Sequence, residues 1–321
     1  MNCRNNDNPN ILNLVGNNTL SGTIHLNVGG SRAIFQSDAG LLTLSGTLQY
    51  DGALTGGRTW TFTGAGNTLV SGQIVNSVNG APIGLTKNGT GKLTLSAANS
   101  YGNTTTVNGG VLELTGSITS TNGVVANGGA LAGNGVINDN VVVSNSIASG
   151  TIDALTVNGN FTIAGNLAVD VNRAGLVSDH PIVSGTVSAG AGSVTVNKLG
   201  AALQVGDTFT LFSVPVTGGG ALTISGGGVT WNNNLAVNGT ISVASIIPTT
   251  PTSITAVPSG NALAVSWPGS HLGWVLQTQT NALTVGISTN WVDVPGTGLV
   301  TSTNIPVNAA SPTVFFRLRS P

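Results

Sequence analysis

Apolar and polar residues alternate in short runs along most of this chain of 321 residues. The clearest runs span 23–28, 59–63, 93–95 and 111–114, and Gly, Asn or Asp follows each within a few residues. Because strand side chains alternate with a period of two, one face of each run points inward and the other outward. No fifteen-residue window has a convincing helical period, and Gly, Ser, Asn and Thr are weak helix formers. The pattern predicts an all-β protein made of short strands.

Asn-Gly and Gly-Gly pairs form the corners between these runs. Singly, Asn-Gly pairs close two-residue hairpins, which would give an antiparallel meander or a sandwich. However, segments such as 106–114 and 124–133 recur with the same corner residues, and strands of three to five residues cannot bury a face alone. Gly and Asn also tolerate the positive φ that stacked corners need. We therefore favour a right-handed parallel β-helix, a solenoid with about 20 residues per coil.

The most regular stretch is 85–117, which contains the strands 93–95, 105–107 and 111–114. It resembles the autotransporter-associated β-strand repeat, found in passenger regions of bacterial surface and secreted proteins. The matching residues are Lys87, Gly89-Thr90-Gly91, Leu93-Thr94-Leu95, Asn99, Tyr101, Thr104-Thr105-Thr106-Val107 and Gly109-Gly110-Val111-Leu112. The stretch departs from the family at Gly102-Asn103-Thr104-Thr105, where Thr-Gly-Gly-Thr is usual. The resemblance covers roughly 85–243, and less specifically the segment before it, and implies an extracellular or cell-surface scaffold.

This repeat has no residue that we expect to act in catalysis. We expect its charged residues, Lys87, Lys92 and Glu113, to be solvated, and Tyr101 to pack at a corner.

The composition changes at 246–252, a segment rich in Pro and Thr. Eight of the 12 prolines lie from Pro248 onward, whereas six of the 47 glycines lie beyond Pro251. Such a joint is typical of a domain boundary. We predict a polar N-terminal arm or cap (1–10), a β-helix (11–245), a linker (246–252) and a small β-sandwich-like module (253–321).

The module resembles one that follows such repeats in extracellular proteins of Verrucomicrobia-like bacteria, where the outer-membrane barrel of autotransporters is missing. We expect no barrel and no self-transport for this chain. Since MNCRNNDNPN does not read as a signal peptide, we expect a mature product or a fragment.

Charged residues make up only 6% of the chain, and the formal net charge is −1. The chain has no basic run, which excludes a phosphate-binding surface and therefore nucleic acid as a partner. It also has no run of about 20 apolar residues, so we expect no membrane span. A surface so poor in charge does little to prevent pairing between strand edges. We therefore expect self-assembly into a homopolymer, head to tail or lateral.

Candidate acid/base residues are scattered. Asp139, Asp153 and Asp170 recur at intervals of about 15 residues, and Asp179-His180 falls in a turn that we expect beside Asp170 and Arg173. Polysaccharide lyases and hydrolases need clustered carboxylates. The alternative is that each Asp caps a corner by accepting backbone N–H bonds, which is common in turns. We favour the structural role and predict no enzymatic activity.

The remaining candidate ligands are isolated in the sequence. His25 alternates with apolar neighbours, so we expect it to point outward without a partner. Three separated histidines do not make a metal site. Cys3, the single cysteine, cannot form an intramolecular disulfide. We expect no cofactor.

Three of the five tryptophans, Trp267, Trp274 and Trp291, lie in the C-terminal module. Trp side chains build the cores of small sandwiches, and they also stack on sugars. We expect mainly core positions, with Trp274 the most exposed of the three because it follows Leu272-Gly273. Possible ligand or assembly contacts are Trp274, Trp291 and His271.

The sequence predicts a non-enzymatic extracellular structural protein that self-assembles into a fibre or surface layer. The alternative is a surface adhesin that binds polysaccharide or a host surface, and the third hypothesis is a polysaccharide lyase.

Overall fold

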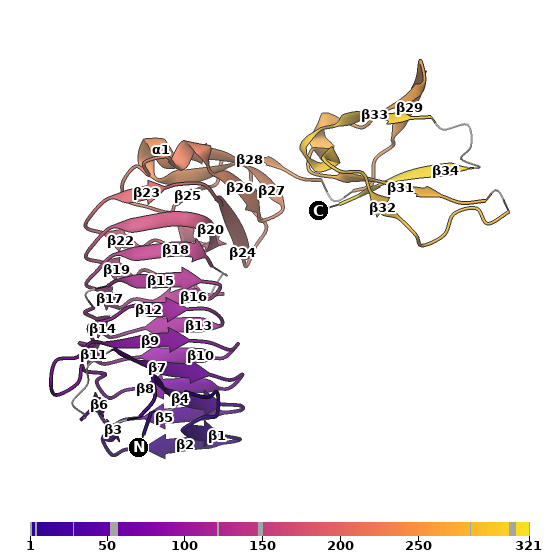
Figure 1. Ribbon diagram of the computed structural model, residues 1–321. Helices are drawn as coiled ribbons and strands as arrows, with labels where there is room; N and C mark the ends of the chain where they lie inside the picture. The colour runs from indigo at the N-terminus through magenta and orange to yellow at the C-terminus, as the bar shows by residue number, and fades with distance from the viewer. Residues whose placement is uncertain are drawn as a thin grey trace. The chain divides into compact units, whose positions relative to one another are not determined.

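The computed structural model describes residues 2–3, 5–27, 29–51, 57–120, 122–146, 150–248, 250–282, 284–307 and 313–320. They form two compact units (Figure 1). The first unit comprises Met1–Gly227 and Trp231–Val243, and the second comprises Gly228–Thr230 and Ala244–Pro321.

The first unit consists mainly of parallel sheets that the chain visits in turn (Figure 1). The path of the 12-stranded sheet is β1 (Ile11–Asn13), β4 (Arg32–Ser37), β7 (Arg58–Thr63), β9 (Ile83–Lys87), β12 (Thr105–Val107), β15 (Val124–Asn127), β18 (Val141–Asn145), β20 (Phe161–Asn172), β24 (Ser193–Leu199) and β26 (Thr223–Gly226). Two further strands, β21 (Val177–Ser178) and β23 (Val187–Ala189), pair with β20.

Two other faces complete each coil. The six-stranded sheet contains β2 (Asn17–Leu20), β5 (Leu41–Leu44), β8 (Asn67–Val70), β10 (Lys92–Leu95), β13 (Val111–Leu114) and β16 (Ala130–Gly133). The third face has β3 (Ile24–Leu26) paired with β6 (Leu48–Tyr50), and a five-stranded sheet of β11 (Ala98–Asn99), β14 (Ser117–Ile118), β17 (Val136–Ile137), β19 (Thr156–Val157) and β22 (Ile182–Val183). Because each sheet pairs successive coils in parallel, the unit is a parallel β-helix, as predicted.

Coil length varies along the stack. In the largest sheet Thr105 pairs with Val124, and Val124 pairs in turn with Val141. Both steps are close to the coil length expected from the sequence, about 20 residues. Near the C-terminal end Ser193 pairs with Thr223, a clearly longer step along the chain. The expected coil length therefore holds in the middle of the stack and is exceeded toward both ends, as the pairing of Phe35 with Phe62 shows at the N-terminal end.

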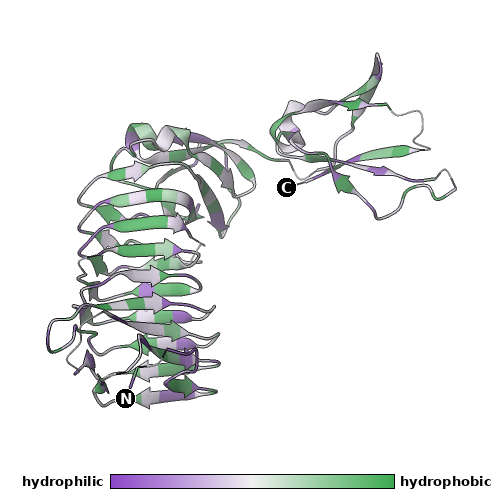
Figure 2. Ribbon diagram, in the orientation of Figure 1, coloured by the Kyte–Doolittle hydropathy of each residue, from purple (hydrophilic) through white to green (hydrophobic). Residues whose placement is uncertain are grey.

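Apolar side chains stack in register inside the β-helix. Leu44, Val70, Leu95 and Leu114 occupy equivalent positions in successive coils of the six-stranded sheet. Each is at most 2% exposed. Figure 2 shows hydrophobic residues on strand after strand of this stack. The interior is thus a set of like-on-like ladders, which explains why short strands suffice: each is stabilised by the coils above and below it.

The corners bring backbones of neighbouring coils very close together. At Gly89 φ is +70°, and a Cβ placed on this residue would lie 2.5 Å from the carbonyl oxygen of Gly64 in the preceding coil. Only glycine accepts both the left-handed conformation and the contact. The high glycine content of the sequence therefore has a specific structural cause at such corners.

The two ends of the β-helix differ. The arm before β1 packs on the next coil: Cys3 is 5% exposed, and the Asn5 side chain accepts a hydrogen bond from the Ser31 N–H. The first coil nevertheless exposes Leu14 (65%) and Val15 (73%). At the other end, β25 (Thr208–Thr210) pairs antiparallel with β28 (Thr240–Ile246), which also neighbours β27 (Val229–Asn234). The short helices η1 (Gly219–Ala221) and α1 (Leu235–Asn238) lie at the same end. Phe209 of β25, Leu235 of α1 and Ile241 of β28 are buried there and cover the apolar interior.

The second unit contains two antiparallel sheets of three strands each. One comprises β29 (Thr255–Ser259), β30 (Ala262–Ser266) and β33 (Ser302–Pro306), and the other comprises β32 (Val292–Asp293), β31 (Val275–Thr280) and β34 (Val314–Arg319). Short 3-10 turns are η2 (Gly269–His271) and η3 (Thr297–Leu299). Val265, Trp267 and Leu276 form the core, against which Phe316 and Leu318 pack. Both sheets contribute to one core, which is the arrangement of a small β-sandwich.

Candidate functional site

The aspartates of the β-helix hold one coil to the next. Asp139 accepts a hydrogen bond from the Gly123 N–H at 2.8 Å, and Asp153 accepts one from the Gly133 N–H at 2.7 Å. In the same way, the carboxylate of Asp170 accepts the Gly150 N–H at 2.8 Å. In each pair the acceptor lies one coil after the donor. The backbone N–H bonds expected of the acids at corners are therefore present.

Asp179 makes the most connected of these contacts. One carboxylate oxygen accepts the Asp153 N–H at 2.9 Å and the other accepts the Asp170 N–H at 2.8 Å. Burial is the main reason that the pKa of Asp179 rises to about 7, and the neighbouring carboxylates of Asp170 and Asp153 raise it further. The backbone N–H groups oppose this shift. The side chain therefore acts as a clamp between coils and titrates near neutral pH.

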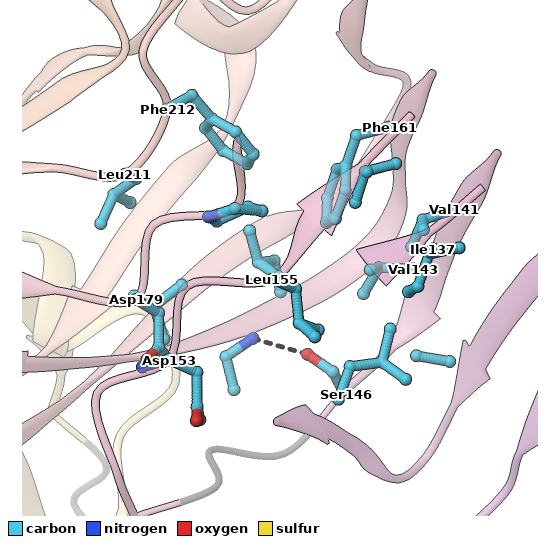
Figure 3. A pocket seen from close by; sticks show the side chains of 17 residues that line it. Ile137, Val141, Val143, Ser146, Asp153, Leu155, Phe161, Asp179, Leu211 and Phe212 are labelled. Carbon is cyan, nitrogen blue, oxygen red and sulfur yellow. Dashed lines mark hydrogen bonds between the residues drawn. The ribbon is translucent and has the colours of Figure 1, made fainter. Parts of the chain in front are cut away.

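A small cavity lies beside this clamp, inside the β-helix (Figure 3). Its volume is about 70 Å³, and apolar side chains such as Val143, Leu155 and Phe161 line most of it. Asp153 and Asp179 stand at its edge in Figure 3. Ligand pockets usually measure about 300–1,000 Å³. At about 70 Å³ the cavity is therefore smaller than such a pocket.

The predicted acid/base constellation is only partly assembled. Asp170, Asp153 and Asp179 are neighbours, and His180 donates its backbone N–H to the Asp153 carbonyl at 2.9 Å. Arg173 instead pairs with Asp207 at 3.1 Å. The expectation that Arg173 completes this group is therefore wrong, since the β20–β21 hairpin directs it to another partner.

Metal ligands do not gather in the described part of the chain, where no group of three His, Cys, Asp or Glu side chains is placed to hold an ion. His25 does have a partner, Asp51, whose carboxylate lies 2.5 Å from its Nδ1 atom. The prediction of an unpaired His25 is therefore wrong, because the next coil supplies the acid. Cys3 is a free, buried thiol whose pKa is raised mainly by burial.

Lys87 is buried rather than solvated, which corrects the expectation from the sequence. It is only 3% exposed, and its ammonium group donates to the carbonyls of Asn88 (2.7 Å), Gly89 (3.1 Å) and Gly109 (3.1 Å). Burial lowers its pKa to about 8. One amine thus joins the corners of two successive coils. Tyr101 packs fully buried, as expected, and its hydroxyl lies 2.6 Å from that of Thr105.

The other two charged residues of this repeat meet across strands. Lys92 and Glu113 form an ion pair at 3.0 Å and are partly exposed. The hydroxyl of Thr94 donates to the same carboxylate at 2.7 Å. Together with Lys92, this hydrogen bond lowers the pKa of Glu113 against the opposing effect of burial.

In the second unit, Trp274 is 5% exposed, so the prediction that it is the most exposed tryptophan is wrong. Its indole N–H donates to the Pro248 carbonyl at 2.8 Å. His271 is also buried, and its Nε2 atom lies 3.0 Å from the Thr250 carbonyl. The two rings meet edge to face at 5.1 Å. The Pro/Thr segment thus folds back onto the unit and covers both side chains.

Trp291 is the tryptophan of this unit that reaches the surface. It is partly exposed, and the Arg317 guanidinium carbon lies 4.4 Å from the centroid of its ring. Sequence reasoning named Trp291 but missed its polar neighbours Gln277, Asp293 and Arg317. The alternation of Phe316 and Leu318 with Arg317 and Arg319 was the available signal, because it places both arginines on the face away from the core.

The fold is a parallel β-helix in which Asp139, Asp153 and Lys87 form hydrogen bonds between successive coils. Residues 85–114 match the family model described as passenger-associated transport repeat. This stretch is therefore a repeat of the autotransporter passenger type, which indicates a surface-associated β-helical protein. No curated protein and no solved structure matches the chain. None of the helices in the described ranges has the length and hydrophobicity needed to span a bilayer.

Proposed function

We propose that the chain is a non-enzymatic structural protein of the bacterial cell surface or extracellular space, in which the β-helix serves as a rigid scaffold. The supporting observation is that its carboxylates are already engaged. Asp139, Asp153, Asp170 and Asp179 all accept backbone N–H groups between coils. A general acid or base needs a carboxyl group within reach of a substrate proton. These groups instead serve as coil-to-coil links.

A lyase assay tests the non-enzymatic part of this proposal. Purified chain incubated with acidic polysaccharides and calcium is expected to release no unsaturated or shortened product. Product release that disappears in Asp179→Asn, while the variant remains folded by circular dichroism, would contradict the proposal.

We further propose that the scaffold self-associates through its first coil into a fibre or surface layer. Strands β1 and β2 are edge strands of their sheets, and every residue of β2 is exposed. An open hollow of about 460 Å³ is lined by Ile11, Leu20 and Ile24, among others. Unpaired edges with apolar side chains and few charges favour strand addition by a second copy. At the C-terminal end of the β-helix the apolar side chains are buried, so this end is less suited to strand addition by a second copy.

Negative-stain electron microscopy of the full chain tests this association. We expect filaments or end-joined particles, which Val15→Lys at the exposed first coil abolishes. Val78→Lys is a matched control, because Val78 is 58% exposed but lies at a corner within the stack. Loss of assembly in both variants would favour lateral contacts, and single rods at all concentrations would contradict self-association.

A surface adhesin is the second candidate, and one observation favours it. The second unit keeps Trp291 partly exposed beside a cation, while Trp267 and Trp274 are buried. Exposed aromatic rings beside polar groups are typical of sugar contacts. In this proposal the β-helix carries the module that makes the contact.

A further inference from the structure

The second unit is almost free of charge, and its few charged residues lie together. From 244 to 321 the sequence has three residues of the types Asp, Glu, Lys and Arg, namely Asp293, Arg317 and Arg319. All three lie in the β32–β31–β34 sheet, on the face opposite to core residues Leu276, Phe316 and Leu318. The Asp and Arg residues of the second unit are therefore concentrated on one sheet face.

These side chains form a connected row across the sheet. Gln277 stands directly opposite Asp293 on one side and Arg317 on the other. Its amide donates to Asp293 at 2.6 Å and accepts from Arg317 Nε at 2.7 Å, while Arg319 donates to Asp293 at 3.0 Å. Because Gln277 is only 7% exposed, a buried amide fixes the charged groups around it. The row is therefore held in place before any ligand arrives.

The exposed parts of this row remain available for binding. Arg317 uses Nε for Gln277, and its two terminal nitrogens have no hydrogen-bond partner among the described residues. Trp291, two residues before Asp293, lies under the same guanidinium. The hydrogen bonds from Gln277 and Arg319 lower the pKa of Asp293, so this carboxylate is ionised at neutral pH. With two arginines and one aspartate, the patch carries a net positive charge.

We infer that this Arg–Trp patch (Gln277, Trp291, Asp293, Arg317 and Arg319) binds an acidic polysaccharide. The free guanidinium fork of Arg317 matches the geometry of a sugar carboxylate. The adjoining indole offers a flat apolar surface for the C–H face of the sugar ring. Asp293 retains acceptor capacity for hydroxyl groups. An open sheet face suits an extended glycan chain, which passes over it, better than a small enclosed ligand.

This inference deepens the adhesin candidate and does not depend on self-association of the β-helix. Isothermal titration calorimetry of the full chain with a galacturonate hexamer measures it, with a neutral glucose hexamer and inorganic sulfate as comparison ligands. We expect binding of the uronate oligomer alone, weakened at 0.5 M NaCl because salt screens exposed charges.

Variants separate the patch from general charge effects. Arg317→Gln is expected to weaken binding at least tenfold, Trp291→Ala at least fivefold, and Arg317→Lys by less than Arg317→Gln, because lysine keeps the charge but lacks the fork. Lys198→Gln removes one positive charge from the β-helix and is expected to leave affinity unchanged. Thermal melts confirm that each variant is folded.

Three outcomes would overturn the inference: no heat with the uronate oligomer, equal affinity in wild type and Arg317→Gln, or equal binding of the neutral oligomer. Sulfate bound as tightly as the oligomer would reduce the patch to a simple anion site and also contradict the proposal. If the protein is monomeric and still binds the uronate oligomer, the binding proposal holds and the self-association proposal is contradicted.

Discussion

At the scale of single residues, Lys87 shows how this fold treats polar groups. An ammonium group has three donors, and in the β-helix three carbonyls from two coils receive them. Alternation along β9 (IGLTK) could place Lys87 on the inner side, but lysine is rarely buried. The sequence therefore predicted a solvated residue. The Gly109 carbonyl, which accepts a hydrogen bond from the buried ammonium group, lies in the following coil. The sequence alone does not show that this corner stacks beside Lys87.

Replacing Lys87 tests its role. We expect Lys87→Met to destabilise the protein by about 2 kcal/mol, because it leaves buried carbonyls without donors. Lys92→Met should cost below about 1 kcal/mol, since Lys92 forms a partly exposed ion pair. Urea unfolding at pH 7 measures both. Equal effects of the two changes would contradict a specific role for the Lys87 cage.

Gly89 and Gly80 separate two effects of a corner glycine. Both have positive φ, +70° and +76°, but only at Gly89 would a Cβ meet backbone, the Gly64 oxygen at 2.5 Å. Gly80→Ala should cost about 1 kcal/mol, the strain of a left-handed conformation. Gly89→Ala should cost distinctly more, because a stacked coil cannot move aside. Thermal unfolding of the two variants measures the difference, and equal midpoints would contradict it.

At the scale of elements, the sequence pattern predicted individual strands better than it predicted how distant segments pair and pack. Period-two alternation correctly predicted strands at 93–95, 105–107 and 111–114, and corner residues favoured a parallel stack. The antiparallel pairing of β25 with β28 at the C-terminal end was not predicted, because buried residues there, such as Phe209 and Leu235, resemble any other apolar residue in the sequence. The burial of Trp274 also escaped prediction, since it depends on the Pro248 carbonyl, which is distant in the sequence.

The Asp179 clamp makes the stability of its coils depend on pH. The pKa of Asp179 is about 7 in the fold and near 3.8 in the unfolded chain, so the folded state binds more protons between these values. Stability from this group therefore falls as pH rises from about 4 to 7, with a slope of at most about 1.4 kcal/mol per pH unit. The carboxylates of Asp153 and Asp170 contribute to the same shift.

Asp179→Asn removes this titration. We expect the wild type to lose unfolding free energy relative to Asp179→Asn as pH rises from 4.5 to 7.5. Chemical denaturation of both proteins over this range measures the change. A difference that is constant over this range, or that changes in the opposite direction, would contradict the assignment.

At the scale of the whole molecule, the chain joins a stack with unlike ends to a sandwich that carries one charged patch. The passenger-type repeat at 85–114 lies within the stack, where Lys87 binds corner carbonyls and Lys92 pairs with Glu113. We propose that function lies in the first coil and in the second unit. The first coil has exposed apolar side chains such as Val15, and the second unit has the partly exposed Trp291 beside Arg317.

Sedimentation velocity of the purified full chain over a hundredfold dilution tests the central claim, a self-associating structural scaffold. We predict a weight-average mass that rises with concentration and falls back toward the monomer for Val15→Lys. A single monomeric species at every concentration, unchanged by that substitution, would contradict it.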